Sequence, residues 1–147
     1  MQIIHADVSL VEQVAPLFDR YRQFYGQPSD LNRAKDFLRD RLTQSESVMF
    51  VAMAETALGF TQLYPSFSSV SLQRIWILND LFVLPEARNQ GIGMALLERA
   101  KAWGIETQAK RISLRTAVDN VAAQTLYQKA GYLKDNAFWQ YDLDLSQ

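Results

Sequence analysis

Residues 75–84 form an apolar run of β-branched, aromatic and aliphatic side chains that only Asn79 and Asp80 interrupt. A run of this kind is typical of a strand that is buried on both faces. Pro85 lacks a backbone donor and is therefore expected to end the strand. After a short charged turn, apolar residues recur at helical spacing, which predicts a helix that begins close to Gly91. Its apolar positions are Ile92, Leu96, Ala100 and Trp103.

The part of the chain before this run has a pattern of one strand, two helices and a hairpin. We predict a strand at 2–6, helices at about 9–25 and 30–42, strands at 48–54 and 58–64, and a Ser-rich loop at 65–69. Ser9 and Glu12 have the spacing of a capping box for the first helix, and Ser29 is expected to cap the second.

The part after the predicted helix alternates polar and apolar residues at 111–116, which indicates a strand parallel to 75–84, joined to it by a right-handed crossover. A helix is expected at 121–130, capped by Asp119 or Asn120 and ended by Gly131. Further strands are predicted at 132–134 and 138–145. The pattern predicts an α/β fold, with a central mixed sheet of about seven strands and about four helices, in a single domain over residues 1–147.

The junction between the strand at 75–84 and the following helix has the properties of an anion site. The first amides of a helix have no partners within it, and the helix dipole is positive at that end. Gly91 and Gly93 carry no side chains that would keep a pyrophosphate from the backbone, and Arg88 adds a positive charge. The P-loop motif is excluded because its Lys and Ser/Thr are missing, and the dinucleotide fingerprint requires a third glycine where Leu96 stands.

The composition of the chain narrows its function further. It has 147 residues, 48% of them hydrophobic, as expected for one folded domain. The net charge is −1, with no basic block, so we expect no nucleic-acid partner and no polybasic membrane patch. No apolar run approaches the ~20 residues of a membrane span, and the first residues lack the pattern of a signal peptide. We therefore expect a cytoplasmic protein.

The near absence of cysteine and histidine argues against two kinds of catalysis. The chain has no cysteine, and His5, at the first predicted strand, is its one histidine. No Gly-x-Ser-x-Gly motif is present, and a zinc site with one histidine and no cysteine would be unusual. We expect His5 to be an ordinary strand residue and the protein to use no metal. Direct transfer between two bound substrates is favoured over nucleophilic or metal catalysis.

Two motifs resemble those of the GNAT superfamily of N-acyltransferases. Arg88-Asn89-Gln90-Gly91-Ile92-Gly93 is similar to the acyl-CoA pyrophosphate loop, whose pattern is Arg/Gln-x-x-Gly-x-Gly/Ala. The segment from Asn120 to Tyr132 is close to the second signature, Asn-x-x-Ala-x-x-Leu-Tyr-x-x-x-Gly-Phe, and follows at the expected distance. The resemblance is strong over the second half of the chain, whereas the first half matches through the order of its elements. It implies a GNAT-like acyl-CoA N-acyltransferase fold.

The resemblance implies roles for particular residues. Acetyl-CoA would be the cosubstrate, with its pyrophosphate on the loop and its pantetheine arm paired with the preceding strand. The implied cofactor-binding residues are Leu81, Phe82, Val83, Arg88, Asn89, Gln90, Gly91, Ile92, Gly93, Met94, Asn120 and Tyr127. The helix pair at 9–42 would border the acceptor groove, with Tyr21, Phe24, Tyr25, Asn79 and Asp80 as candidate substrate contacts. For the aromatic residues, packing in the core is the simpler interpretation.

The chemistry of acyl transfer suggests an acid and a base. An amine with a pKa of ~10.4 must lose a proton before it attacks a thioester. Asp80 is the best-placed carboxylate, and burial would raise its pKa and make it a better base; alternatively it caps a bulge or pairs with Arg74 or Arg115. The phenol of Tyr127 could protonate the departing thiolate, and a backbone N–H near Phe82 could stabilise the developing negative charge. Relatives with a similar strand often have Glu-Asp where this chain has Asn79-Asp80.

We therefore interpret the chain as an acetyl-CoA-dependent N-acetyltransferase that acts on a small-molecule or peptide amine in a ternary complex. The alternative is a catalytically silent acyl-CoA-binding sensor or interaction module. A nucleotide-dependent oxidoreductase is disfavoured by the missing glycine. The acceptor, whether polyamine, amino acid, aminoglycoside or protein amine, is left open, and a homodimer would be compatible with the family.

Overall fold

The computed structural model describes residues 1–146. The chain divides into two compact units, Met1–Arg115 and Thr116–Gln147. The first unit contains one sheet with helices on both faces, and the second contains one helix and the C-terminal segment. No helix among the described residues is long and apolar enough to cross a membrane.

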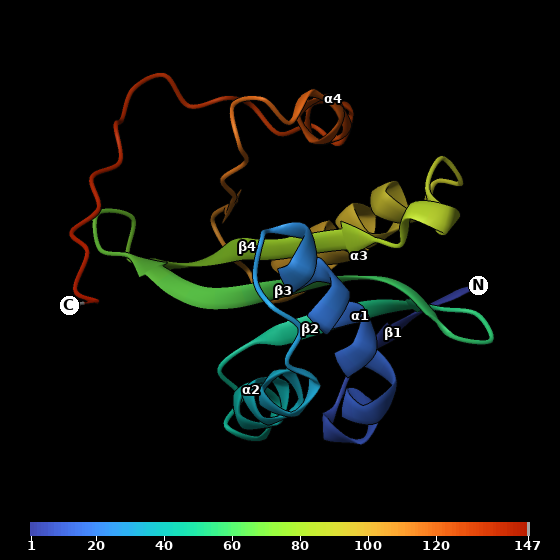
Figure 1. Ribbon diagram of the computed structural model, residues 1–147. Coiled ribbons are helices and arrows are strands. Elements are labelled where there is room, and N and C mark those ends of the chain that lie inside the picture. The colour runs from blue at the N-terminus through green and yellow to red at the C-terminus, as the bar shows by residue number, and fades with distance from the viewer. Residues whose placement is uncertain (147) are drawn as a thin grey trace. The chain divides into compact units, whose positions relative to one another are not determined.

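The sheet of the first unit has five strands in the order of the chain (Figure 1). They are β1 (Gln2–His5), β2 (Val48–Met53), β3 (Ala57–Ser68), β4 (Gln73–Val83) and β5 (Ile112–Ser113). Neighbours from β1 to β4 are antiparallel, whereas β5 is parallel to β4. The predicted α/β class, with a mixed sheet and four helices, is therefore confirmed.

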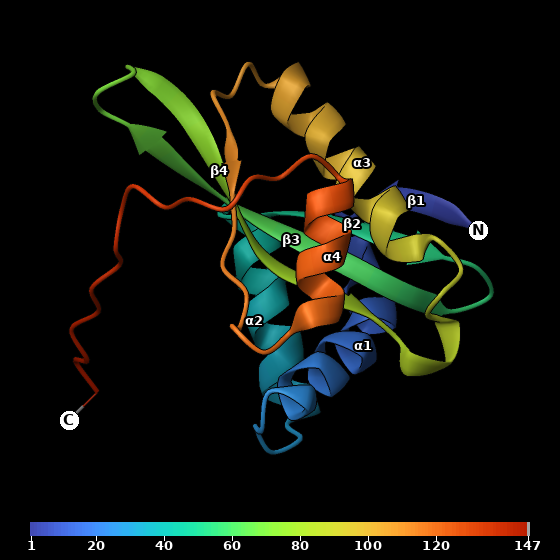
Figure 2. The same ribbon diagram turned by 90° about the horizontal axis from the view of Figure 1, so that it is seen from above.

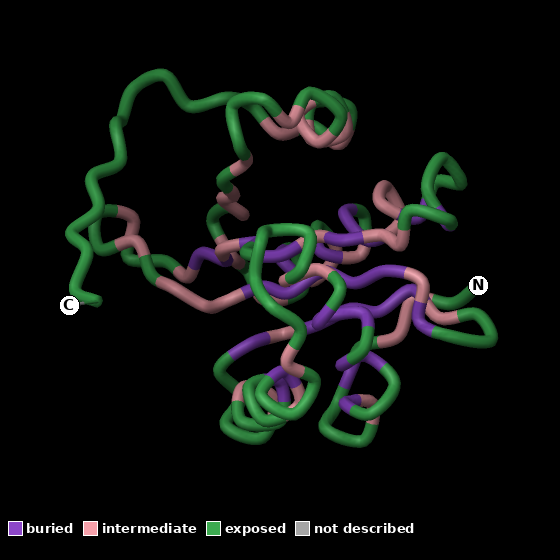
Figure 3. Tube along the Cα trace, viewed as in Figure 1, coloured by how far each residue is buried: buried purple, intermediate pink, exposed green. Residues whose placement is uncertain are grey.

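Helices cover both faces of this sheet. α1 (Val11–Phe24) and α2 (Leu31–Thr43) lie on one face, and α3 (Ile92–Glu106) lies on the other (Figure 1). The central strands are accordingly buried (Figure 3). On the α1 face the core includes Val14, Phe18, Leu38, Val51, Phe60 and Phe82. Burial on both sides explains why β2 and the apolar run of β4 read as nearly continuous hydrophobic segments.

The starts of α1 and α2 differ from the predicted caps. Asp7, not a Ser9–Glu12 capping box, accepts the Ser9 amide and caps a short 3₁₀ turn that precedes α1. Asp30, not Ser29, caps α2 by accepting the amide of Arg33. Either residue type can cap a helix, so tertiary contacts decided which one does.

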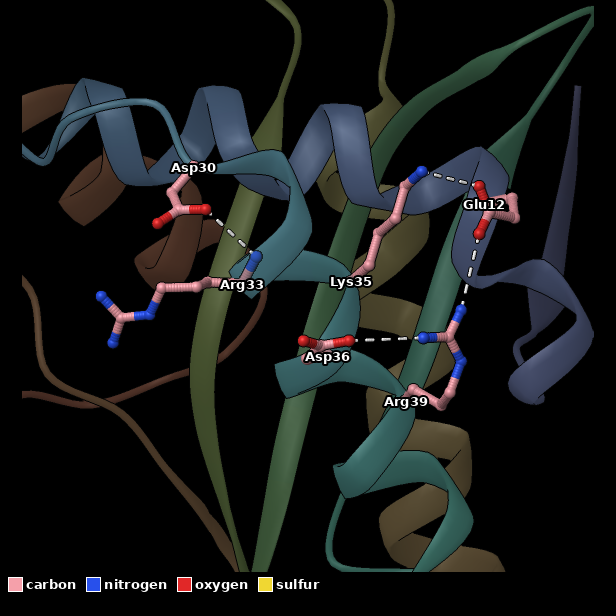
Figure 4. Close-up of polar contacts among 6 residues, drawn as sticks. All are labelled: Glu12, Asp30, Arg33, Lys35, Asp36 and Arg39. Atoms are coloured by element: carbon pink, nitrogen blue, oxygen red, sulfur yellow. Dashed lines mark hydrogen bonds and ion pairs between the residues drawn. The ribbon is translucent and has the colours of Figure 1, made fainter.

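Glu12 instead contributes to the packing of α1 on α2. Its carboxylate lies 2.8 Å from Lys35 Nζ and 3.5 Å from Arg39 Nη2 (Figure 4). Arg39 also pairs with Asp36 on its own helix (Figure 4). Because Glu12 is exposed, these ion pairs contribute little to the free energy of unfolding.

Strand β3 is longer than predicted and includes the expected loop at 65–69 as far as Ser68. Pro65 is tolerated because it pairs only with Trp76 of β4 and lies beyond Leu63, the last residue of β3 that pairs with β2. Because the β2–β3 ladder has already ended at Leu63, the missing N–H of Pro65 removes no hydrogen bond from it.

The second unit contains α4 (Val121–Lys129), whose ends agree with the prediction. Asn120 Oδ1 accepts the amide of Ala123 at the N-terminus, and Gly131 ends the helix at a φ of 96°. Beyond it the chain continues to residue 146 without a further helix or strand (Figure 2).

The predicted strands at 132–134 and 138–145 are not formed in residues 1–146, so the prediction of about seven strands was wrong: this part of the chain contains five. A strand requires a backbone partner, and none of the strand pairs of the described residues includes this segment. Its alternating apolar side chains are exposed.

Candidate functional site

A β-bulge in β4 places Asp80. The register pairs Asp80 with Gln62 and Leu78 with Leu63, which leaves Asn79 as an extra residue on β4. Asn79 is consequently exposed, and Asp80 turns toward the α1 face with only 5% of its surface exposed. The bulge thus buries Asp80 and exposes Asn79, the two polar residues that interrupt the apolar run.

Three side chains donate hydrogen bonds to the buried Asp80 carboxylate. Tyr21 Oη lies 2.8 Å from Oδ1, Gln62 Nε2 lies 2.9 Å from Oδ2, and Asn79 Nδ2 lies 3.1 Å from Oδ1. Burial raises the pKa of Asp80 above its ordinary value, and the three hydrogen bonds work against that rise. The result is a carboxylate held in one orientation, with a greater proton affinity than an exposed aspartate.

The polar surroundings of Asp80 include residues that the sequence analysis missed. Thr61 and Gln62 are fully buried in β3, and Thr61 Oγ1 donates to the backbone oxygen of Asp80. Burial, followed by the nearby Asp80 charge, raises the pKa of Tyr64 to about 12. The available signal was the polar pair Thr61-Gln62 inside an otherwise apolar strand, because buried polar groups need partners.

Tyr21 is a positioning residue for Asp80, and its role gives a first prediction. A Tyr21→Phe substitution removes one donor to the charged form of the carboxylate, so the pKa of Asp80 should rise further. We expect the acidic limb of the pH profile of kcat/KM to move to higher pH, with the folded protein otherwise intact. A profile unchanged from the parent protein would contradict this role. Tyr25→Phe, at the residue that directly follows α1, provides a control.

Phe24 and Tyr25 form an exposed aromatic surface beside Tyr21. Their side chains are 57% and 58% exposed, and the Phe24 ring lies 6.1 Å from that of Phe82. The guanidinium of Arg88 lies 5.8 Å from the Phe24 ring centre and donates to Val83 O at 3.0 Å. Their exposure separates these two residues from the buried core and leaves them available to a ligand.

Strands β4 and β5 pair at two positions only, Trp76 with Ile112 and Ile77 with Ser113. Beyond them, residues 81–83 pair with β3 on one side. The amide of Leu84 donates to the carbonyl oxygen of Leu58 in β3. Along a strand, the backbone amides of successive residues point alternately to one edge and to the other. The amides of Leu81 and Val83 therefore face the edge away from β3, where no strand lies among the described residues, and the amide of Phe82 faces β3.

The segment from Arg88 to Gly93 forms the turn into α3. Asn89 and Gly91 have φ values of 62° and 80°, and residues 88–91 are exposed. The amide of Ala95 is the one that closes the first turn on Gly91 O, so the amides of Ile92, Gly93 and Met94 precede the helical hydrogen bonds. A Cβ at Gly91 would meet nothing within 4 Å, so the backbone at Gly91 itself faces open space. The loop therefore fits a pyrophosphate.

Gly59 of β3 brings α3 close to the sheet at this loop. A Cβ at this position would lie 2.9 Å from Phe82 O and 3.3 Å from Ile92 Cγ2.

A Gly59→Ala substitution must shift β4 or the start of α3, and we expect a loss of about 1–3 kcal/mol in the free energy of unfolding together with weaker acetyl-CoA binding. Thermal denaturation and calorimetry would measure the two effects. Gly104→Ala, at a glycine of α3 where a Cβ would meet only the Ile112 side chain, at 3.3 Å and 3.4 Å, is the control for close packing between α3 and the sheet. Equal acetyl-CoA affinity in the parent and Gly59→Ala proteins would argue against this packing role.

The remaining two predicted site residues lie in the second unit. Asn120 uses Oδ1 to cap α4. Tyr127 lies on α4, half-buried, with its ring 6.0 Å from that of Tyr132. Their predicted contacts with the cofactor remain predictions.

A cavity of about 720 Å³ in the first unit contains none of the predicted site residues. Its lining includes His5, Ser47, Arg74, Trp76 and Trp103. His5 lies at the end of β1 and packs against Phe50 and Trp103. No group of three or more His, Cys, Asp or Glu residues that could hold a metal ion occurs in residues 1–146.

Comparison with known proteins agrees with this geometry. The model of the acetyltransferase (GNAT) family matches residues 11–132. The uncharacterized N-acetyltransferase YhfO of Bacillus subtilis (strain 168) is 47% identical over 146 residues, covering 99% of this chain and 98% of its own. A crystal structure of a probable acetyltransferase is 45% identical, with a TM-score of 0.95 over 100% of this chain and 99% of that chain. The chain therefore belongs to the GNAT acetyltransferase family.

A more distant structure shares the fold. The aminoglycoside acetyltransferase AAC(6')-Iy, in complex with the bisubstrate analogue CoA-S-monomethyl-acetylneamine, has a TM-score of 0.79 and 20% identity, over 97% of both chains. At this identity the similarity concerns the fold.

Proposed function

We propose that this protein transfers an acetyl group from acetyl-CoA to a primary amine of a small molecule. The observation that carries the proposal is the buried carboxylate of Asp80, which hydrogen bonds hold in one orientation. It lies on the same strand as the open edge at Leu81 and Val83, and this strand leads into the Arg88–Gly93 loop. Membership of the GNAT family supports this reading of the site.

The chain offers suitable groups for each part of acetyl-CoA. The amides at the start of α3 and the side chain of Arg88 would hold the pyrophosphate. The open edge of β4 would accept the pantetheine amides as a further strand accepts its neighbour. Asn120, Met94 and Tyr127 complete the proposed set of contacts. When bound, acetyl-CoA supplies the acetyl group as a thioester.

Asp80 then has a defined task. It accepts a proton from the incoming ammonium group, directly or through one water, and so provides the neutral amine that attacks. Its raised pKa brings its proton affinity closer to that required at neutral pH. The amide of Leu81, at the open edge, would donate to the oxygen that gains charge. Tyr127 would supply a proton to the leaving thiolate.

The proposed acceptor is a small amine with apolar or ring-shaped surface next to its amino group. Phe24 and Tyr25 present exposed aromatic faces beside Tyr21, which itself contacts Asp80. A ring or methylene chain can pack on such faces, and an ammonium group is attracted to them. The aminoglycoside analogue bound by AAC(6')-Iy is one chemical example of this class.

The test is the release of free thiol from acetyl-CoA with a panel of polyamines, amino acids, aminoglycosides and N-terminal peptides, alongside calorimetry of acetyl-CoA binding. Turnover with a small amine supports the proposal. Turnover confined to peptides would correct the acceptor class. Tight acetyl-CoA binding without turnover would favour the sensor, and failure to bind acetyl-CoA would overturn the cosubstrate assignment.

A further inference from the structure

The cavity of about 720 Å³ lies at the end of the sheet where β1 stops and β2 starts. Its lining includes His5, the last residue of β1, and Val48, the first residue of β2. Ser47, just before β2, and the indoles Trp76 of β4 and Trp103 of α3 also line it. Cavities of this size hold small molecules in other proteins. None of the described lining residues belongs to the proposed acetyl-CoA or acceptor site.

Two buried donors of the lining lack a hydrogen-bond partner. Ser47 is only 7% exposed, and its Oγ has no partner within residues 1–146. The Nε1 of Trp103 is likewise buried and without a partner in this part of the chain. The other indole differs, because Trp76 Nε1 donates to Thr107 Oγ1 at 2.9 Å. Buried polar groups normally have partners, so the two open positions indicate a ligand with acceptor atoms.

Arg74 adds a positive charge that no carboxylate of the described residues neutralises. The ion pairs within residues 1–146 do not include Arg74. Its guanidinium lies over two rings, 5.2 Å from the ring centre of Trp76 and 5.1 Å from that of Phe67. A guanidinium that lies on a ring keeps its N–H groups available at the edge, where they can bind a carboxylate with two parallel hydrogen bonds.

The charges of the lining favour a singly charged anion. Among the described lining residues, Arg74 and Asp7 are the charged ones, and the Asp7 carboxylate accepts the amide and the hydroxyl of Ser9. Burial, followed by the charge of Arg99, lowers the pKa of His5, which favours the neutral imidazole at neutral pH. One available cation matches the charge of a carboxylate better than that of a phosphate, which carries nearly two charges at this pH.

The walls of the cavity suit an aromatic ring. The ring centres of Trp76 and Trp103 are 5.8 Å apart, and the His5 ring lies 5.1 Å from that of Trp103. Such flat side chains offer apolar faces and edges on which another ring can pack.

The connection between α2 and β2 is fixed without a ligand. The amide of Glu46, next to Ser47, donates to Arg41 O at 2.9 Å, and its carboxylate lies 3.0 Å from Arg41 Nε. The position of Ser47 is therefore set in advance, which reduces the entropy lost on binding.

We propose that this cavity is a binding site for a small aromatic carboxylate. The carboxylate pairs with Arg74 and accepts hydrogen bonds from Ser47 and Trp103, while the ring packs against the indoles. The site is separate from that of acetyl transfer, since Trp103 belongs to α3 and the Asp80 carboxylate contacts Tyr21 of α1, on the other face of the sheet. This inference goes beyond the proposed function and does not depend on it.

Phenylacetate is the test ligand, with phenylacetamide as its uncharged counterpart and inorganic phosphate as an anion without a ring. Calorimetry on the full-length protein should show phenylacetate binding, with the two comparison ligands about 10- to 100-fold weaker, as expected when a charged hydrogen bond or the ring contact is lost. In heteronuclear NMR spectra, the indole N–H signal of Trp103 should shift more than that of Trp76, whose N–H already has a partner.

Two variants locate the ligand. Arg74→Gln should weaken phenylacetate binding about 10- to 100-fold, and Ser47→Ala about 3- to 10-fold. Arg33→Gln, at an exposed arginine of α2 that does not line the cavity, is the matched control and should leave the affinity unchanged. Ser47→Ala removes a hydroxyl without a partner, so this variant should fold at least as stably as the parent protein, which a thermal melt will verify.

Several outcomes would overturn the proposal. No binding of phenylacetate at millimolar concentration would mean that water alone serves the two donors. Equal affinity for phenylacetamide would exclude an anion site, and tighter binding of phosphate would exclude the carboxylate class. Affinity unchanged by both Arg74→Gln and Ser47→Ala would place the ligand outside the cavity. Loss of phenylacetate binding in the Asp80→Asn protein would place it at the acceptor site instead.

Discussion

Replacing Asp80 with asparagine should lower kcat/KM for the amine by about 10²- to 10⁴-fold, the range expected when a general base is removed. Acetyl-CoA binding should change little, because the proposed cofactor contacts lie at the open edge of β4 and at the loop. In the parent protein, the acidic limb of the pH profile of kcat/KM should lie at a higher pH than the ordinary pKa of an aspartate, because burial raises the pKa of Asp80. This limb should disappear in the variant. Steady-state thiol release between pH 5 and 9 would measure both effects.

The stability of the variant separates catalysis from folding. Because the pKa of Asp80 is raised on folding, its stabilising contribution is fully present below the unfolded pKa and is lost as the pH rises through the folded pKa. At neutral pH the Asp80→Asn protein should therefore unfold no more readily than the parent, apart from the rearrangement of the hydrogen bonds from Tyr21 and Gln62. Lost activity together with a large loss of stability would contradict the role of base.

Asp19 provides the matched control, as a second buried aspartate. It accepts hydrogen bonds from Ser29 Oγ at 2.6 Å and from the amide of Asp30 at 2.8 Å. Burial acts to raise the pKa of Asp19, but these hydrogen bonds, together with the Arg22 charge and a hydrogen bond from Gln23, outweigh it and hold the pKa below its ordinary value. Its stabilising contribution is therefore present above the unfolded pKa and is lost as the pH falls through the folded pKa. Asp19→Asn should lower stability at neutral pH while leaving the pH profile of kcat/KM in place.

A Tyr127→Phe substitution should lower kcat by about 10²-fold, because the departing thiolate, with a thiol pKa of ~8.5, would lose its proton donor. The loss should shrink when the acyl donor has a more acidic thiol, which leaves without protonation. The measurement compares kcat for two acyl thioesters of different leaving-group pKa in the parent and variant proteins.

Tyr132→Phe is the control for this substitution, since Tyr132 lies in the same unit with its ring 6.0 Å from that of Tyr127. It should retain the dependence of kcat on the leaving group that the parent shows. Full turnover by the Tyr127→Phe protein, or a loss equally large for both thioesters, would argue against Tyr127 as the acid.

Local sequence signals were sufficient for much of the fold. The apolar run of β4, the helical spacing after Gly91 and the stop at Gly131 each depend on near neighbours in the chain, and the structure forms all three close to their predicted bounds. The pyrophosphate-loop pattern was readable for the same reason, because its glycines act on the backbone of the loop that contains them.

The sequence by itself thus determined the order of the helices and of the first five strands, the GNAT resemblance and the hypothesis that Asp80 is the carboxylate of the site. Only the tertiary structure decided what surrounds that carboxylate, because Tyr21 and Gln62 reach it from α1 and β3, 59 and 18 residues away along the chain. It also decided that, within residues 1–146, the predicted strand at 138–145 is not formed. Alternation shows that a segment can pair, but a strand forms only where a partner edge is available, and this depends on contacts that no local pattern contains.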